Sequence, residues 1–265
     1  MGVMKHAIGH FVSKVIKFLG RLAGLDLIRL AYAENGIGQS HSFEASGERK
    51  FVLEYLPSKL LTTEPVIFDV GSNRGDYAKL VLTAFPKAKL MCFEPNPGTF
   101  QLLSQNLASS ASLFQMGFGK QTGTFDLYFD ARDQTSVMAT SNPEILKSIS
   151  KVTETEKVQI KVETLDNFCA SQKIDRIDFL KVDTEGFELD ILQGAKKMLE
   201  EKRINIIQFE FNETAAIQRI FLKDFYEFLA GFDFYRLSSR GMIPLGSWQP
   251  AHEIFLFQNV VAIRT

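Results

Sequence analysis

The segment Val66–Asp76, which reads VIFDVGSNRGD, decides the fold of this chain. Its first five residues are apolar except for Asp69, as in a strand that is buried on both faces. Gly71 follows at once and permits a tight turn, and Gly75 lets the next helix start close to that strand. Apolar side chains then recur at helical spacing over Asp76–Phe85. The segment therefore predicts a buried strand, a tight turn and a helix in direct succession.

Strands and helices alternate in the same way further along the chain. Buried strands are expected at Lys89–Glu94, Leu113–Phe118, Ile177–Val182 and Ile204–Phe211, helices at Pro97–Leu107, Glu188–Glu200 and Ile220–Leu229, closing strands at Tyr235–Leu237 and Glu253–Phe257, and extra edge strands at Thr124–Phe129 and Val158–Val162. This alternation predicts a doubly wound, mostly parallel α/β sheet of seven strands. The polar stretch Asp130–Glu156 has little periodicity and is expected to face the substrate or to form a mobile insert.

A short N-terminal segment precedes this domain. Apolar side chains form one face of an expected helix over Ile8–Ala23, and Lys14, Lys17 and Arg21 lie on the other face. We expect an N-terminal amphipathic helix and loop over residues 1–48 and the main domain over 49–265. The apolar face could pack on the main domain or across a homodimer interface. The basic face leaves a peripheral contact with an anionic membrane surface as the alternative.

The composition excludes some classes of partner. Lys and Arg number 30 against 31 Asp and Glu, so binding to nucleic acid through a large basic surface is not expected. The cysteines, Cys92 and Cys169, have no metal-ligand spacing and form no disulfide framework, which fits a reducing compartment. No apolar run reaches the roughly 18 residues of a membrane span. A cytoplasmic location is expected, with the N-terminal helix as the element that could touch the inner membrane face.

In a doubly wound sheet, ligands bind beyond the carboxyl ends of the strands. The turn after the first strand lacks the middle glycine of the dinucleotide fingerprint G-x-G-x-x-G. Asp69 would repel a pyrophosphate but suits an ammonium group, and Glu94, expected at a surface turn, could accept hydrogen bonds from ribose hydroxyls. These residues favour S-adenosylmethionine as the cofactor. A nicotinamide oxidoreductase and a non-catalytic domain whose glycines only form turns remain alternatives.

Several segments together resemble one protein family. They are VIFDVGSNRG at 66–75, FEPNP at 93–97, ETLDNF at 163–168, DFLKVDTEGFE at 178–188 and LQGA at 192–195. In this order and at these separations they resemble the FkbM family of S-adenosylmethionine-dependent methyltransferases, over about residues 65–215. The resemblance implies a class I, Rossmann-like methyltransferase fold. It also implies transfer of a methyl group to a hydroxyl oxygen of a sugar, glycan, glycolipid or related natural product.

The resemblance also implies which residues hold the cofactor. Asp69 and Gly71 would hold its amino-acid end and Glu94 its ribose, while Phe118 would pack on the adenine. The full set that it implies is Asp69, Gly71, Asn73, Gly75, Glu94, Pro95, Asn96, Phe118, Gly119, Ser136 and Asp183. Family members often carry an aspartate that accepts from adenine just after this point, and this chain has Lys120 instead.

Carboxylates follow the fourth and fifth parallel strands of the expected sheet. Asp183 and Glu185 follow the fourth strand, and Glu210 ends the fifth. A carboxylate can take the proton from an acceptor hydroxyl, so all three are catalytic candidates. Their oxygen atoms could alternatively bind a divalent cation, but no metal is expected. A non-catalytic, cofactor-binding scaffold is the rival function, and the presence of these carboxylates favours an enzyme. Asp166 is expected to cap its own helix.

Overall fold

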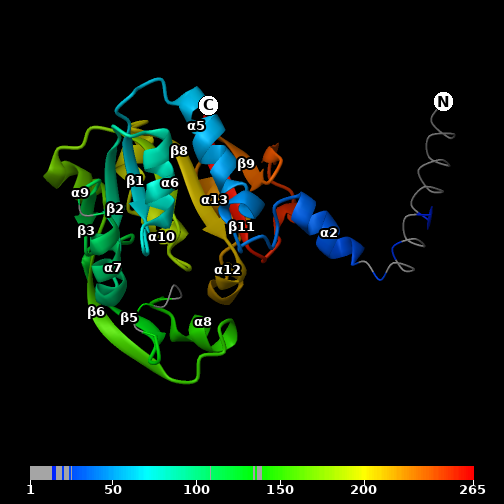
Figure 1. Ribbon diagram of the computed structural model, residues 1–265, viewed down its shortest axis with the longest axis horizontal. Coiled ribbons are helices and arrows are strands. Elements are labelled where there is room, and N and C mark those ends of the chain that lie inside the picture. Colours follow the sequence, from blue (N-terminus) through cyan, green and yellow to red (C-terminus); the bar gives the residue numbers. More distant parts are fainter. Residues whose placement is uncertain are drawn as a thin grey trace.

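The computed structural model describes residues 14, 15, 20, 24, 26–107, 109–133, 135 and 139–265. These residues form a main sheet, a smaller second sheet and helices on both faces of the main sheet (Figure 1). The main sheet has the order β10 (Gly241–Pro244), β9 (Phe232–Ser238), β11 (Gln258–Arg264), β8 (Ile204–Phe211), β7 (Ile177–Val182), β1 (Val66–Val70), β2 (Lys89–Phe93) and β3 (Ser112–Phe114). The second sheet has the order β4 (Gly117–Phe118), β6 (Thr155–Glu163) and β5 (Gly123–Asp130).

The helical elements connect these strands. In chain order they are α2 (Leu27–Glu34), α3 (Phe43–Ser46), α4 (Glu48–Lys50), the π-helix η1 (Phe51–Tyr55), α5 (Leu56–Lys59), α6 (Asp76–Ala84), α7 (Pro97–Leu107), α8 (Pro143–Ser148), α9 (Leu165–Gln172), α10 (Glu188–Gln193), α11 (Lys196–Glu200), α12 (Glu213–Gln218), α13 (Leu222–Phe228) and the 3-10 helix η2 (Pro250–His252).

The main sheet is mostly parallel. β3, β2, β1, β7 and β8 run parallel to one another, and β11 runs antiparallel to both of its neighbours. The prediction of a doubly wound, mostly parallel sheet is confirmed. The strand count of seven is wrong, because the hairpin strand β10 brings the main sheet to eight.

Two apolar clusters bury the two faces of the main sheet. Phe68 belongs to the cluster under α9, α10, α11 and α13, whereas its neighbour Ile67 belongs to the cluster under η1, α6 and α7. Successive side chains of a strand point to opposite faces, so β1 contributes to both clusters. This double burial fixes β1 in the centre of the molecule and places the turn after Val70 at the carboxyl edge of the sheet.

Two strand predictions are wrong in position. Residues 253–257 form no strand, and the closing strand is β11, which begins at Gln258. β11 is hard to recognise in the sequence because its first two residues, Gln258 and Asn259, are polar although they are buried. Their burial is possible because Gln258 accepts from Arg236 and Asn259 accepts from Gln208. The expected third strand splits into β3 and β4. The edge strands expected at 124–129 and 158–162 lie in the second sheet, where β6 pairs with both β4 and β5, instead of extending the main sheet.

The helix predictions differ from the structure at four points. The helix expected at 188–200 is interrupted between α10 and α11, where a Cβ on Gly194 would lie 2.1 Å from the carbonyl oxygen of Gly119. α12 is an additional helix, and α13 begins at Leu222. Thr164, not Asp166, caps α9, and the Asp166 carboxylate instead accepts from the first backbone N–H groups of α11.

Most of the helix expected at Ile8–Ala23 lies outside the described residues. In the loop expected over residues 34–47, Ser42 caps the short helix α3. α2 extends outward from the rest of the described chain and has no buried residue (Figure 1). In the described part of the chain, no helix has the length and apolar character of a membrane span.

Candidate active site

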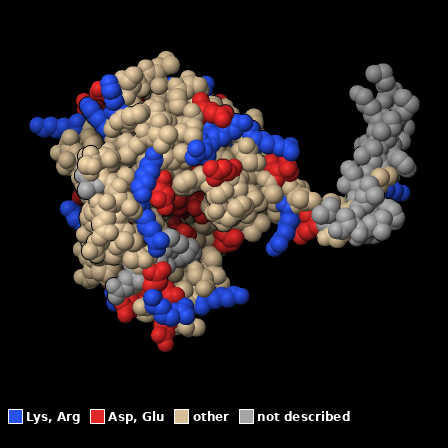
Figure 2. Space-filling model, in the orientation of Figure 1, with Lys and Arg blue, Asp and Glu red and all other residues tan. Residues whose placement is uncertain are grey.

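A cavity of about 900 Å³ opens at the carboxyl ends of β1, β2, β7 and β8. The second sheet contributes apolar side chains to one side of it, among them Phe118 and Leu127. In Figure 1, β5, β6 and α8 lie on the side of the main sheet to which the arrowhead of β8 points. Figure 2 shows Asp and Glu side chains gathered in a hollow of the surface. The cavity is therefore lined by apolar side chains on one side and is rich in carboxylates.

The turn after β1 forms the first wall of the cavity. Gly71 has a φ of 81°, and a Cβ at this position would lie 1.8 Å from the carbonyl oxygen of Asp183. Only glycine allows the turns after β1 and β7 to approach so closely. Gly71 and Asn73 line the cavity, whereas Gly75 packs on α7, where its Cβ would meet Leu107 at 2.6 Å.

Glu94 lies at the end of the cavity beyond β2. Its carboxylate accepts hydrogen bonds from the backbone N–H of Asn73 at 3.1 Å and of Asn96 at 2.8 Å. Glu94 is buried, so the expectation of a surface turn is wrong. Burial raises the pKa of Glu94 to about 7. The neighbouring Thr99 also lines the cavity, and its buried hydroxyl has no hydrogen-bond partner within the described structure.

Phe118 lies beside this end of the cavity. Its ring packs edge-on against Phe93, with 4.7 Å between ring centroids. Gly119 and Pro95 also line the cavity, while Asn96 does not and instead shapes the turn by accepting from the N–H of Gly98. Ser136 lies outside the described residues.

A buried lysine lies beneath the centre of the cavity. The Nζ of Lys181 is 2.8 Å from Asp183 Oδ2 and 3.8 Å from Asp69 Oδ1, and it lies over the ring of Tyr77. Asp69 is 1% exposed and does not line the cavity, so its charge faces Lys181. Sequence reasoning missed Lys181; the available signal was a lysine inside the strand segment Ile177–Val182, whose other charged residue is Asp178 near its start.

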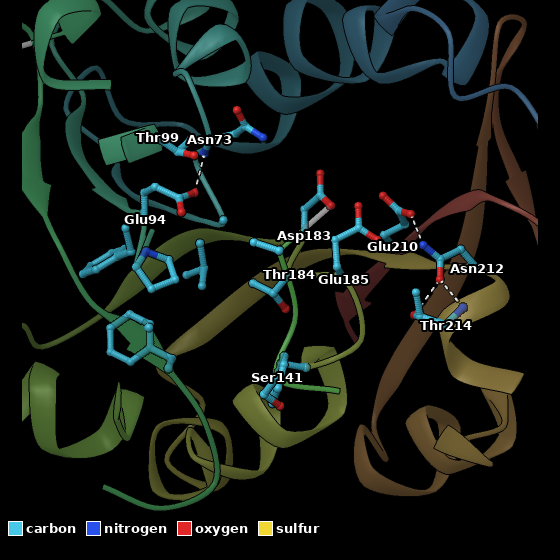
Figure 3. A pocket seen from close by; sticks show the side chains of 18 of the residues that line it. Asn73, Glu94, Thr99, Ser141, Asp183, Thr184, Glu185, Glu210, Asn212 and Thr214 are labelled. Atoms are coloured by element: carbon cyan, nitrogen blue, oxygen red, sulfur yellow. Dashed lines mark hydrogen bonds between the residues drawn. The ribbon is translucent and has the colours of Figure 1, made fainter. Parts of the chain in front are cut away.

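Asp183, Glu185 and Glu210 come together, as the order of the strands predicted. One carboxylate oxygen of each lies within 4.8 Å of the others, and Figure 3 shows the three side chains next to one another at the cavity. Glu185 has a φ of 54°, a left-handed conformation that is rare outside glycine and often found at functional sites. Its Oε2 atom is buried and has no hydrogen-bond partner among the described residues.

The three carboxyl groups differ in their affinity for a proton. Burial opposes ionisation of Asp183, but the charge of Lys181 outweighs it and lowers the pKa of Asp183. Burial, reinforced by the charge of Asp183, raises the pKa of Glu185 to about 8. Burial and the charges of Asp183 and Glu185 raise the pKa of Glu210 well above its ordinary value. Asp183 is therefore the ionised member of the cluster at neutral pH.

Asn212 and Glu188 hold the cluster in place. The side-chain oxygen of Asn212 accepts from the N–H and hydroxyl of Thr214, so its NH₂ group points to Glu210 and donates to Oε1. Glu188 accepts from the N–H groups of Thr184 and Gly186 and so fixes the turn that carries Glu185. Lys181 and Asn212 thus direct N–H donors at two of the three carboxylates.

Two further polar residues reach the cavity from distant parts of the chain. Glu48, at the start of α4, lines it and accepts from Ser46 and Gln208. Asn259, on β11, lines it opposite Glu210 in the strand register. No sequence motif marks either residue, because only the antiparallel entry of β11 and the packing of α4 bring them to the site.

Known proteins match this chain over much of its length. The family model described as the methyltransferase FkbM domain matches residues 69–235. The 2-O-methyltransferase NoeI of Sinorhizobium fredii is 28% identical over 193 residues, which cover 70% of this chain and 79% of NoeI. The hexuronic acid methyltransferase AglP of Haloferax volcanii is 28% identical over 146 residues, which cover 55% of this chain and 56% of AglP.

A solved structure also matches. The crystal structure of methyltransferase FkbM from Methylobacillus flagellatus aligns with 83% of this chain and 52% of its own, at 17% sequence identity and a TM-score of 0.45.

Proposed function

The chain belongs to the FkbM methyltransferase family, and we propose that it transfers a methyl group to a hydroxyl oxygen of a sugar, glycan, glycolipid or related natural product. Its methyl donor is S-adenosylmethionine. The names of two relatives support an oxygen as the methylated atom and a sugar as the class of acceptor, respectively: NoeI is named a 2-O-methyltransferase, and AglP a hexuronic acid methyltransferase. The observation that carries the proposal is the carboxylate cluster at the cavity, which can accept the proton of an acceptor hydroxyl.

The residues at the β1–β2 end of the cavity fit this cofactor. Gly71 lines the cavity where the amino-acid end would bind, and Glu94 with the unpartnered hydroxyl of Thr99 would meet the ribose hydroxyls. Phe118 offers an apolar face for the adenine. When bound, S-adenosylmethionine supplies a methyl group that its sulfonium already activates, so the protein contributes mainly position and proton removal.

Glu185 is the residue that we assign as the general base. Its Oε2 atom has no partner within the described structure and is free to accept a proton from the acceptor hydroxyl. A base works best when its pKa lies near the operating pH, and the pKa of Glu185 is raised to about 8. Asp183, held ionised by Lys181, would orient the acceptor beside it.

The proposal is tested by incubating the full chain with methyl-labelled S-adenosylmethionine and a panel of sugars and glycosides. We expect label in a product that is one methylene heavier and carries an alkali-stable methyl ether. A product methylated on nitrogen or carbon would contradict the choice of oxygen. The absence of any labelled product, with normal cofactor binding, would favour a non-catalytic protein.

Changing Glu94 to Ala should weaken cofactor binding at least tenfold, or about 1.4 kcal/mol. The change removes the acceptor of a ribose hydroxyl and frees two backbone N–H groups that Glu94 now binds, so thermal stability should fall as well. Calorimetry with S-adenosylhomocysteine and a melting curve measure the two effects. The exposed Glu156→Gln, on β6, is the control and should change neither. An unchanged cofactor affinity in Glu94→Ala would place the ribose contact elsewhere.

A further inference from the structure

Acidic side chains that line the cavity far outnumber basic ones. Among the described residues that line it, Lys120 is the single lysine or arginine, and it lies 3.6 Å from the carboxylate of Asp190. Away from the cofactor end, the lining carboxylates are Glu44, Glu48, Asp183, Glu185, Glu210 and Glu213. Figure 2 shows Asp and Glu side chains within the hollow and Lys and Arg side chains around it.

Cations already balance a few of these charges. Lys181 is paired with Asp183 and Asp69, and Arg49 lies 3.5 Å from Glu44 at the surface. Within the described structure, no lysine, arginine or histidine nitrogen lies within 4.0 Å of a carboxylate oxygen of the remaining four, which are Glu48, Glu185, Glu210 and Glu213. A positive charge at this end of the cavity would therefore be attracted from several sides.

We infer that the methyl acceptor carries a protonated amine, as in an amino sugar or amino alcohol, bound at the end of the cavity lined by Glu48, Glu210 and Glu213. This inference rests on the proposed function and names its substrate class. An ammonium group next to these side chains would supply the missing counter-charge, while Asn259 offers an amide group to the hydroxyls of the same molecule.

The protonation of the cluster supports the same class of acceptor. Burial, reinforced by the charge of Asp183, raises the pKa of Glu48, Glu185 and Glu210, so the protein alone retains protons on acids that a bound cation would allow to ionise. The cofactor has an ammonium, a sulfonium and a carboxylate, and thus one net positive charge, which is fewer than the lining acids. A uronate, the class in the name of AglP, would add a further negative charge to this end.

The inference also explains the position of Glu48. Its side chain is 6% exposed, and its carboxylate is held by Ser46 at 2.7 Å and by Gln208 at 2.9 Å. Gln208 in turn accepts from the hydroxyl of Tyr77 and donates to Asn259. A carboxylate fixed by such a network is oriented before the ligand arrives, which is the arrangement that selects one charged group over its neutral analogue.

Three probes that differ only at C6 of one ring test the inference. They are methyl 6-amino-6-deoxy-α-D-glucopyranoside, methyl α-D-glucopyranoside and methyl α-D-glucopyranosiduronate. Each is titrated into the full chain saturated with S-adenosylhomocysteine, and binding is followed by ligand-observed NMR. We expect the amine to bind at least tenfold more tightly than the neutral glycoside, and the uronate to bind most weakly.

Variants then test where the amine binds. Glu213→Gln should reduce the preference for the amine at least threefold, as should Glu48→Gln if its melting curve shows that it folds. The exposed Glu156→Gln should leave the ranking unchanged. Three results would each overturn the inference: equal affinities for the three probes, no measurable binding of any probe, or binding of the uronate that is tighter than that of the amine. Because the readout is binding, this result is independent of whether methyl transfer to oxygen occurs.

Discussion

Replacing Lys181 by Met is expected to lower the free energy of unfolding by about 3–5 kcal/mol and to abolish methyl transfer. The lysine side chain is 4% exposed and pairs with Asp69 and Asp183. Met fills a similar volume but leaves the two carboxylates without their cation. The carboxylate oxygens of Asp69 are buried and have no hydrogen-bond partner within the described structure, so their charge would be uncompensated. Asp183 would lose the interaction that lowers its pKa and would no longer be held ionised at the cavity.

Urea denaturation and a transfer assay measure the two effects. Lys196→Met is the matched control, because Lys196 forms an exposed pair with Glu200 that contributes little to stability. The double variant Asp69→Asn with Lys181→Met should recover part of the lost stability but not the activity, because Asp183 still lacks its partner. A Lys181→Met protein as stable as the control would show that the buried carboxylates take up protons at little cost.

Replacing Glu185 by Gln is expected to lower kcat by about 10²–10⁴-fold, the usual contribution of a general base, with little change in cofactor affinity. The amide keeps the size of the side chain but cannot accept the proton. Because the pKa of Glu185 is raised to about 8 and the ionised form is the active one, kcat/KM of the unaltered protein should rise with pH and level off above about pH 8. Glu185→Gln should lose this rise.

Glu200→Gln, at an exposed position of α11, is the control and should keep both the rate and the pH profile. A Glu185→Gln protein that is slow but retains the same rise with pH would transfer the role of base to Glu210 or Asp183. A loss of activity that parallels a loss of cofactor binding would instead mean that Glu185 contacts the cofactor.

The sequence by itself determined the parallel half of the fold. The strands Val66–Val70 and Ile177–Val182 match β1 and β7, because short, mainly apolar segments that are bounded by turn residues and alternate with helical patterns favour buried parallel strands. The turn at Gly71 and the helix α7 were likewise predicted, because a glycine directly after a strand and a helical spacing of apolar residues are local signals. The order of the parallel strands was enough to bring Asp183, Glu185 and Glu210 to one opening.

Only the tertiary structure decided which charges meet. Asp69, expected to face an ammonium group of the cofactor, faces Lys181 on the neighbouring strand, because the register of β1 with β7 sets Asp69 directly beside Lys181. Glu48 and Asn259 enter the cavity from opposite ends of the chain, and β11 was missed because its buried polar start is satisfied by distant side chains. Local patterns report whether a residue is buried. The partner that makes burial of a polar group tolerable comes from any part of the chain, and only the packed structure identifies it.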